Sequence, residues 1–367
     1  MKIPLIRPYI PAKSREYLEE VLASGFLTEG PMTRRLEDAV AEYVGCRYVF
    51  AVPNCTVGLE IALRAAGIGP GDEVVVPDYT YPATADAVAI VGAVPVIVDI
   101  DRETMLMDIA AAEDAITEKT RAVMPVSEFG NPLDHDAWRE LCERHGLRLI
   151  EDAACSLGSA FKGRRTGGLA DVSVFSMHPR KFITSGEGGL VTTDDDGLAD
   201  FINRYKHFGI VPGGGISFGT IGTNAKLSNI LSAVALGQFE MIDEMLERRI
   251  ALARRYTELL SGARGIRLPR TTRGGLHSYQ TYSVFVQDRD RVMREMRESG
   301  IEAQIGTIAL HREKAFGSNA GVRLHGSLSN ADEVADTNLA LPLYHEMTSA
   351  EQDAVVSKLL DLVRVDG

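Results

Sequence analysis

The chain has 367 residues, of which 45% are hydrophobic, and its formal net charge is −12. This length and apolar content are sufficient for a deep core and for more than one domain. The acidic balance, with basic residues interspersed among acidic ones, argues against nucleic acid or an anionic membrane as a partner, and no apolar run is long enough to cross a bilayer.

In the first half of the chain, short β-rich runs alternate with helical segments. This alternation predicts an α/β fold with a mostly parallel sheet. A strand over residues 46–52 leads through a turn at 54–56 into a helix over 57–66. An apolar strand is expected at the start of the stretch 71–84, where it opens into a loop with two aromatic residues. Further strands are expected at 93–99, 121–126, 147–151, 172–176 and 189–193, and further helices at 134–145 and 198–207.

The pattern changes beyond residue 226. Apolar residues recur at helical spacing from Leu227 to Leu260, which predicts one long helix that links two domains. The glycine run at 213–215 predicts a mobile loop before it. We therefore expect a large domain over residues 1–240 and a smaller domain over 241–367. Its predicted elements are a strand at 280–286 and helices at 290–299 and 350–363.

The cysteines and the N-terminus indicate a reducing compartment. The cysteines, Cys46, Cys55, Cys142 and Cys155, lack the paired spacing of a disulfide framework or a zinc site, so we expect reduced thiols and no bound metal. The first eight residues contain one lysine but no sustained apolar stretch and no cleavage site of small residues. These features predict a cytoplasmic protein.

The most informative segment runs from Ser176 to Gly189, because it places Lys181 between a serine hydroxyl and a glycine-rich turn. Upstream, the strand at 147–151 delivers Asp152 at its carboxyl end, where open α/β sheets place their chemistry. Alone, such a lysine is usually solvated and such an aspartate usually caps a helix. Together they match pyridoxal phosphate (PLP), which needs a lysine for its aldehyde and a carboxylate for its pyridine nitrogen.

The turn at 54–56 predicts the site for the phosphate of this cofactor. A strand, a small polar turn and a helix aim free backbone N–H groups at an anion. We expect the N–H groups of Cys55 and Thr56, with the hydroxyls of Thr56 and Ser176, to bind the phosphate. After the next strand, the loop around Tyr79 and Tyr81 offers an aromatic ring that could stack on a flat cofactor.

With these residues in place, the chain resembles the DegT/StrS family of sugar aminotransferases, which are fold-type I PLP enzymes. Ordered matches run from Pro4 almost to the C-terminus. The segments that carry the likeness are Leu-Thr-Glu-Gly-Pro at 27–31, Gly-Pro-Gly-Asp-Glu-Val at 69–74, Ala-Val-Met-Pro-Val at 122–126, Glu-Asp-Ala-Ala at 151–154, Gly-Glu-Gly-Gly at 186–189 and Leu-Pro-Leu at 341–343.

The resemblance implies a mostly parallel seven-stranded sheet with helices on both faces, and a smaller C-terminal α+β domain. It also implies that Lys181 anchors the cofactor and moves a proton, that Asp152 faces the pyridine nitrogen, and that Tyr81 stacks on the ring. Asn224 is expected to reach the phosphate from a neighbouring subunit, which implies a homodimer with shared active sites.

The family pattern also suggests residues at the substrate. His178 lies in the turn before Lys181, and both a substrate contact and a structural hydrogen bond remain open for it. His311 resembles a family position in the small domain near the sugar. Lys226 replaces the arginine of the family's Asn-Tyr-Arg, which exchanges a bidentate group for a point charge.

Two further departures concern the cofactor. Cys155 stands where the family usually has Gln or His against the cofactor's phenolic oxygen, and a thiol is a weak donor. That contact could instead belong to Ser156 or to water. The turn reads Asn54-Cys55-Thr56 where many relatives have Ser-Gly-Thr, so only the threonine carries over cleanly.

The resemblance therefore implies a PLP-dependent aminotransferase that transfers an amino group from L-glutamate to a nucleotide-linked keto-sugar. The turn from His178 through Ile183 and Thr184 resembles enzymes that aminate C4 of a 4-keto-6-deoxy sugar. A sugar 3-dehydratase of the same fold is the alternative of another reaction class, but it would carry histidine in place of Lys181. A non-catalytic regulatory protein is a third possibility, and intact Asp152 and Lys181 argue against it.

Overall fold

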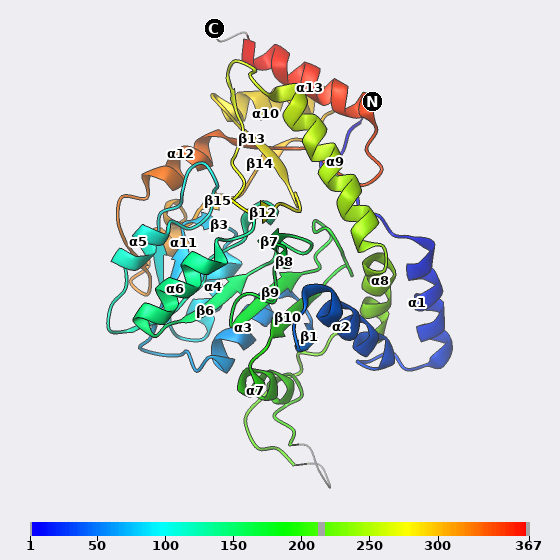
Figure 1. Ribbon diagram of the computed structural model, residues 1–367, viewed down its shortest axis with the longest axis vertical. Coiled ribbons are helices and arrows are strands. Elements are labelled where there is room, and N and C mark those ends of the chain that lie inside the picture. The colour runs from blue at the N-terminus through cyan, green and yellow to red at the C-terminus, as the bar shows by residue number, and fades with distance from the viewer. Residues whose placement is uncertain (1, 212–216, 365–367) are drawn as a thin grey trace.

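The computed structural model describes residues 2–211 and 217–364, and its centre is a sheet of eight strands (Figure 1). Their spatial order is β1-β10-β9-β6-β5-β2-β4-β16. Only β10 runs antiparallel to its neighbours, so within the described ranges the expected mostly parallel sheet is confirmed. The bounds are β1 (Tyr48–Val52), β2 (Glu73–Pro77), β4 (Val94–Val98), β5 (Thr120–Val123), β6 (Arg148–Asp152), β9 (Val172–Ser176), β10 (Gly189–Thr193) and β16 (Arg323–Leu324).

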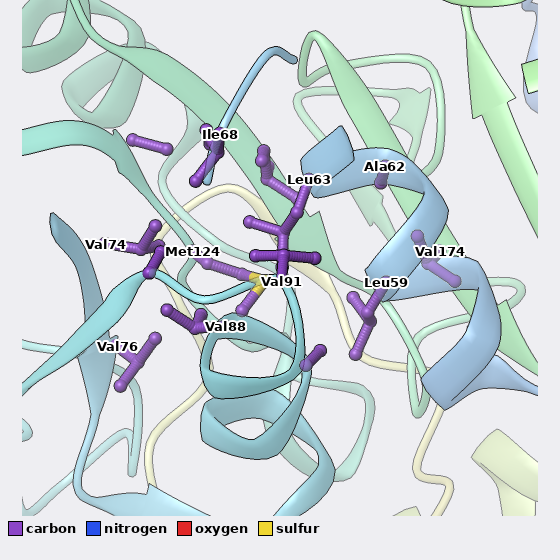
Figure 2. Packing of buried hydrophobic residues seen from close by; sticks show 14 of the residues in the cluster. Leu59, Ala62, Leu63, Ile68, Val74, Val76, Val88, Val91, Met124 and Val174 are labelled. Atoms are coloured by element: carbon purple, nitrogen blue, oxygen red, sulfur yellow. The ribbon is translucent and has the colours of Figure 1, made fainter. Parts of the chain in front are cut away.

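The strands of this sheet are buried on both sides because helices cover both of its faces. In β2, Val74 belongs to one apolar cluster and Val75 to another, as the alternation of side chains along a strand requires. Figure 2 shows the first cluster, to which Leu63 and Val88 contribute from adjacent helices. The helices of the first cluster include α3 (Cys55–Ala65), α4 (Ala83–Ile90) and α7 (Asp196–Lys206), and those of the second are α5 (Ile109–Asp114) and α6 (His135–His145).

A second, smaller sheet forms the core of the C-terminal part of the chain. Its strands follow the order β11-β13-β17-β14 and are antiparallel, and helices pack on it through one apolar cluster. This arrangement confirms the expected α+β unit. Its strands are β11 (Ile266–Arg267), β13 (Tyr282–Val286), β14 (Gln304–Ile305) and β17 (Asn338–Leu341), and its helices are α9 (Ile242–Leu260), α10 (Arg289–Glu298) and α13 (Ser349–Arg364).

Part of the C-terminal chain returns to the first sheet. The short strand β16 pairs with β4 and adds an eighth strand that the sequence analysis did not predict. Similarly, β15 (Ile308–Ala309) pairs with β3 (Tyr79–Thr80), close to the loop that carries Tyr81. The proposed domain boundary at residue 240 stays a prediction. Further elements are β7 (Ala160–Phe161), β8 (Arg164–Arg165), β12 (Gly275–Leu276), α11 (Lys314–Gly317) and α12 (Ser329–Thr337).

The single long helix expected from Leu227 to Leu260 is wrong. The chain instead forms α8 (Asn229–Phe239) and α9, separated by Glu240 and Met241. Met241 leaves helical geometry, and its N–H donates to Gln238, three residues back, rather than four. Because the break occupies only two residues, the apolar spacing continues across it and conceals it. In Figure 1, α9 then runs from α8 toward α13 at the far end of the molecule.

Helices near the N-terminus belong to a further apolar cluster, which includes residues of β1 and α8. α1 (Ala12–Ser24) and α2 (Pro31–Val44) both pack on α8, and α2 also contacts β1. The sequence analysis did not predict α1, α2, α4, α5 or α12. The glycine run at 213–215, interpreted as a mobile loop, lies outside the described residues. No helix in the described ranges is both long and apolar enough to span a membrane, and the cytoplasmic location stays a prediction.

A buried lysine at the C-terminal end of α7 forms ion pairs with two glutamates near the N-terminus. The Lys206 side chain is 1% exposed, and its Nζ lies 3.1 Å from Oε1 of Glu29 and 3.5 Å from Oε1 of Glu37. Glu37 also accepts a hydrogen bond from the backbone N–H of Ala51 at 2.8 Å, and Glu29 lies 3.2 Å from His207. Lys206 therefore neutralises two carboxylates, and His207 is a second partner of Glu29.

Replacing Lys206 with methionine should destabilise the fold by about 3–5 kcal/mol, because the change removes the buried cation that two partly buried carboxylates share. Urea unfolding of the purified protein measures the effect. Lys13→Met is the matched control, since Lys13 forms an exposed pair with Glu16 at 3.1 Å and should change stability by no more than about 1 kcal/mol. Equal effects of the two substitutions would contradict the structural role assigned to Lys206.

Candidate active site

One cavity of about 810 Å³ opens at the carboxyl ends of the parallel strands, where α/β sheets usually bind ligands. Asp152 is the last residue of β6, and Ser176 is the last of β9. Both line the cavity with the turn at the start of α3. The predicted residues that the structure brings together here are Cys55, Thr56, Tyr81, Asp152, Cys155, Ser176, His178 and Lys181.

Lys181 extends from the turn after β9 into this cavity. Its Nζ lies 3.0 Å from Sγ of Cys155. Burial lowers the pKa of Lys181, but the neighbouring Cys155 and Glu128 raise it, so the net pKa lies above the ordinary lysine value. Burial also raises the pKa of the Cys155 thiol. The raised pKa favours the ammonium form, so Lys181 must release a proton before it can act as a nucleophile.

Asp152 is 4% exposed, and two donors hold its carboxylate. Oδ2 accepts from Oγ1 of Thr84 at 2.8 Å, and Oδ1 accepts from the backbone N–H of Ala154 at 3.1 Å. Burial raises the pKa of Asp152, while these two donors and Lys181 oppose the shift. A protonated ring nitrogen placed against this carboxylate would lower its pKa, because an opposite charge favours the ionised form.

The start of α3 presents free backbone donors to the cavity. The side chain of Asn54 caps the helix by accepting from the N–H of Val57 at 2.9 Å. In the described part of the chain, no acceptor is bonded to the N–H groups of Cys55 and Thr56, which precede Val57 in the first turn. Two free donors at a helix N-terminus suit a phosphate group. The sequence analysis identified this turn, but it did not foresee the capping role of Asn54.

Gly189 allows this turn to approach the sheet. A Cβ at this position would lie 2.8–2.9 Å from backbone atoms of Asn54 and Cys55, which is closer than side chains pack. The free donors of α3, the carboxylate of Asp152 and the amine of Lys181 therefore share one cavity, and this set of groups fits PLP. Cys55, Thr56 and Ser176 would hold its phosphate, and Asp152 its ring nitrogen. When bound, PLP supplies an electron sink for the carbon that carries the amino group.

The sequence profile of the DegT/DnrJ/EryC1/StrS aminotransferase family matches residues 8–360. The chain belongs to this family. GDP-perosamine synthase of Caulobacter vibrioides is 34% identical over 366 residues, which cover 98% of this chain and 97% of that protein.

Solved structures of aminotransferases share the fold of this family member. DesV of S. venezuelae is 32% identical, and the alignment has a TM-score of 0.93 and covers 99% of this chain and 98% of DesV. The sugar aminotransferase Spr1654 of Streptococcus pneumoniae, solved in a PLP form, is 26% identical, with a TM-score of 0.92 and coverage of 100% and 99%. The family therefore implies PLP as the cofactor of this aminotransferase.

Two other predicted site residues of this aminotransferase, Tyr81 and His178, also line the cavity. Tyr81 lines the cavity, and 72% of the residue is exposed, so one face is available to a bound ring. Nδ1 of His178 accepts from the N–H of Arg180 at 3.2 Å, which supports the structural hydrogen bond that the sequence analysis left open. His178 still lines the cavity, so a substrate contact remains a prediction.

Asn224, Lys226 and His311 do not line this cavity. Lys226 donates to Oδ1 of Asn224 at the end of a segment that extends beyond α7. His311 instead pairs with the buried Asp78, with Nδ1 at 2.5 Å from Oδ2. A substrate contact for His311 would require its second nitrogen, which lies 3.3 Å from Asp332. The roles proposed for these three residues stay predictions.

Sequence reasoning missed three polar residues of the site. Thr84 orients Asp152, and Glu128 and Gln280 line the cavity wall. Thr84 could have been noticed because the loop after β2 is rich in hydroxyl side chains. Glu128 could have been noticed because it is an acidic residue that interrupts an apolar run after β5. Gln280 had no local signal. Among the described residues, no group of three or more His, Cys, Asp or Glu side chains is arranged to hold a metal ion.

Proposed function

We propose that this aminotransferase uses PLP to move an amino group from L-glutamate to the keto group of a nucleotide-linked 4-keto-6-deoxy sugar. The observation that carries the proposal is the convergence of Lys181, Asp152 and the free N–H groups of α3 on one cavity. The name of the Caulobacter relative, GDP-perosamine synthase, supports a nucleotide-linked substrate. Lys181 argues against the 3-dehydratase, which would carry histidine there.

The chain's own groups divide the work in this proposal. The amine of Lys181, once free, is the base that moves a proton at the carbon bearing the amino group. Asp152 keeps a proton on the ring nitrogen of the cofactor and so maintains the electron sink. Arg180 and Lys181 are the two lysine or arginine side chains that line the cavity in the described ranges. Arg180 is therefore suited to a carboxylate of L-glutamate.

Two half-reactions test this function. PLP-loaded protein is mixed with L-glutamate, and the change in cofactor absorbance and the formation of 2-oxoglutarate are measured. The aminated enzyme is then given GDP-, UDP- and dTDP-linked 4-keto-6-deoxyhexoses, and mass spectrometry detects the amine. We expect one nucleotide series to react. Loss of water without incorporated nitrogen would favour the dehydratase, and inertness toward all three series would overturn the proposed substrate.

The segment around Asn224 supports a homodimer. Between α7 and Asn224, the described residues 207–211 and 217–224 pair with each other, with bridges from His207 to Asn224 and from Ile210 to Phe218. Figure 1 shows this segment projecting beyond α7, away from the sheet. Its large apolar side chains are exposed, and Ile221 reaches 90%. A second copy of the chain would cover these side chains and could receive Asn224 at its phosphate site.

Mixing two inactive variants tests the shared site. Lys181→Ala removes the anchor, and Asn224→Asp turns a negative charge toward the phosphate. In a heterodimer with shared sites, both lesions fall in one site and the other site is wild type. Random exchange of equal amounts should therefore restore about one quarter of wild-type activity, because half of the dimers carry one intact site of two.

Separate verification of subunit exchange, for example by native mass spectrometry, is the control for this mixture. An exchanged mixture that remains inactive would show that Asn224 serves its own subunit or neither, and the shared-site proposal would be abandoned. A protein that remains monomeric at micromolar concentration with PLP bound would have the same consequence.

A further inference from the structure

Glu128 is a buried acid in the cavity wall for which the reaction above has no role. It follows β5, lines the same cavity as Lys181, and is only 6% exposed. The one hydrogen-bond donor that the described residues offer its carboxylate is the backbone N–H of Phe129. Burying an ionisable group with so few partners is unfavourable. The carboxylate therefore retains acceptor capacity that a bound molecule can use.

The backbone next to Glu128 is strained. Phe129 has a φ of 56°, in the left-handed region that non-glycine residues rarely adopt, and Gly130 follows with a φ of 93°. Such strain persists where the surrounding structure enforces it, and it concentrates at functional sites. Here the N–H of Ser278 donates to the carbonyl of Gly130 at 3.1 Å, and Oγ of Ser159 donates to the same carbonyl at 2.7 Å. The turn that presents Glu128 is thus held from two sides.

The same turn packs against the segment that carries Gln280, a second polar residue of the cavity lining. A Cβ on Gly130 would lie 3.0 Å from the carbonyl oxygen of Cys155 and 3.1 Å from the backbone nitrogen of Gln280. Gln280 is 3% exposed and lines the cavity, and its Nε2 donates to the carbonyl of Arg180. Its Oε1 is buried and has no partner among the described residues. This amide oxygen is a second acceptor without a donor.

From these contacts we infer that Glu128 and Gln280 form an acceptor pair that binds hydroxyl groups of the sugar ring at Lys181 and so helps to select the substrate. This inference rests on the proposed function. Two acceptors select hydrogen-bond donors, and hydroxyl groups are the donors that a neutral sugar offers. The carboxylates of L-glutamate offer none at neutral pH. The amino donor is therefore expected to place its carboxylates elsewhere in the cavity.

Calorimetric titration of the PLP-loaded protein tests the pair with matched ligands. The probes are GDP-mannose, UDP-glucose and dTDP-glucose, each compared with its bare nucleoside diphosphate. The dissociation constant of the bare diphosphate, divided by that of the sugar nucleotide, isolates the contribution of the sugar. We expect Glu128→Leu and Gln280→Leu each to reduce this ratio by roughly tenfold or more, the loss typical of hydrogen bonds to a charged or buried group. The affinity for the bare diphosphate should not change.

The controls separate this role from general damage. Glu118→Gln makes the same charge change as Glu128→Gln at an exposed position that does not line the cavity, and it should leave the ratio unchanged. In turnover assays, Glu128→Leu should raise KM for the sugar nucleotide and leave KM for L-glutamate unaltered, because the contact is made equally before and during reaction. A wild-type ratio in both leucine variants would overturn the inference and leave the proposed function standing.

Two further outcomes are informative. If the wild-type protein binds none of the three sugar nucleotides more tightly than the diphosphates, the proposed substrate fails, and the inference fails with it. In the second outcome, Glu128→Gln shifts the pH midpoint of the cofactor's absorbance but leaves the ratio of dissociation constants unchanged. Glu128 would then influence the protonation of Lys181 instead of binding the sugar. That result would also overturn the acceptor pair.

Stability measurements distinguish a functional acid from a structural one. Burial raises the pKa of Glu128 to about 7, although Lys181 and the N–H of Phe129 lower it and Asp152 raises it further. Because an unfolded glutamate ionises near a pKa of about 4.3, the folded protein holds the extra proton between these values, and its stability falls as pH rises through that window. The Glu128→Gln variant cannot ionise at this position, so its stability does not fall in this way as pH rises. Its melting temperature relative to wild type should therefore increase from pH 5 to pH 8, whereas a structural glutamate would predict a decrease.

Discussion

Replacing Lys181 with alanine should abolish covalent attachment of PLP and reduce turnover by roughly 10²–10⁴-fold or more, the contribution typical of one positioned proton-transfer group. Lys181 reaches the cavity from the turn after β9, with its Nζ 3.0 Å from Cys155 and in the cavity that Asp152 also lines. Borohydride reduction of the loaded protein, followed by peptide mass mapping, measures attachment. The label should appear on the peptide that contains Lys181, and it should be absent from the variant.

Lys162→Ala is the control for this experiment, because Lys162 is an exposed lysine paired with Asp136 and should keep both label and activity. A label on any other lysine of the wild-type protein would refute the assignment. The raised pKa of Lys181 adds a pH dependence. Capture of PLP by the unloaded protein needs the neutral amine, so its rate should rise with pH through the neutral range and into the alkaline range.

Replacing Asp152 with asparagine should preserve PLP attachment but slow the half-reaction with L-glutamate by about 10²–10³-fold, as does removal of other preorganised electrostatic groups. Asparagine retains the shape of the side chain. Its oxygen can accept from the N–H of Ala154, and its amide can donate to the hydroxyl of Thr84, which is able to reverse its role. The lost function is therefore the negative charge that keeps the ring nitrogen protonated.

Single-turnover absorbance after rapid mixing measures this step. Thr84→Val is the matched comparison, because it removes one hydrogen bond that orients Asp152 and leaves the charge in place. We expect its effect to be smaller than that of Asp152→Asn. A rate near that of the wild type in Asp152→Asn would show that the carboxylate does not control the ring nitrogen.

The accuracy of the sequence analysis depended on how local each feature is. Asp152 and Lys181 were identifiable because Asp152 ends one short strand and Lys181 lies in the turn after another, and the end of a strand can be recognised from adjacent residues. The phosphate turn was identifiable for the same reason, since a helix N-terminus follows from a few consecutive residues. The site roles of all these residues remain predictions that the experiments above address.

Features that depend on contacts between distant segments were not predicted. Thr84 lies 68 positions from the carboxylate it orients. The break between α8 and α9 leaves the apolar spacing intact, and β16 is a two-residue strand that exists only because β4 offers it an edge. Neither propensity nor periodicity contains this information, because both describe a residue's neighbours along the chain rather than across it.

The sequence by itself thus determined the α/β architecture, the family and the pairing of a lysine with an aspartate, since these follow from local pattern and ordered motifs. Only the tertiary structure decided what surrounds that pair. It placed Glu128 and Gln280 in one wall and excluded Asn224, Lys226 and His311 from the cavity lining. The physical reason is that burial and hydrogen-bond partners arise when separate segments pack together, and that packing is a property of the whole fold.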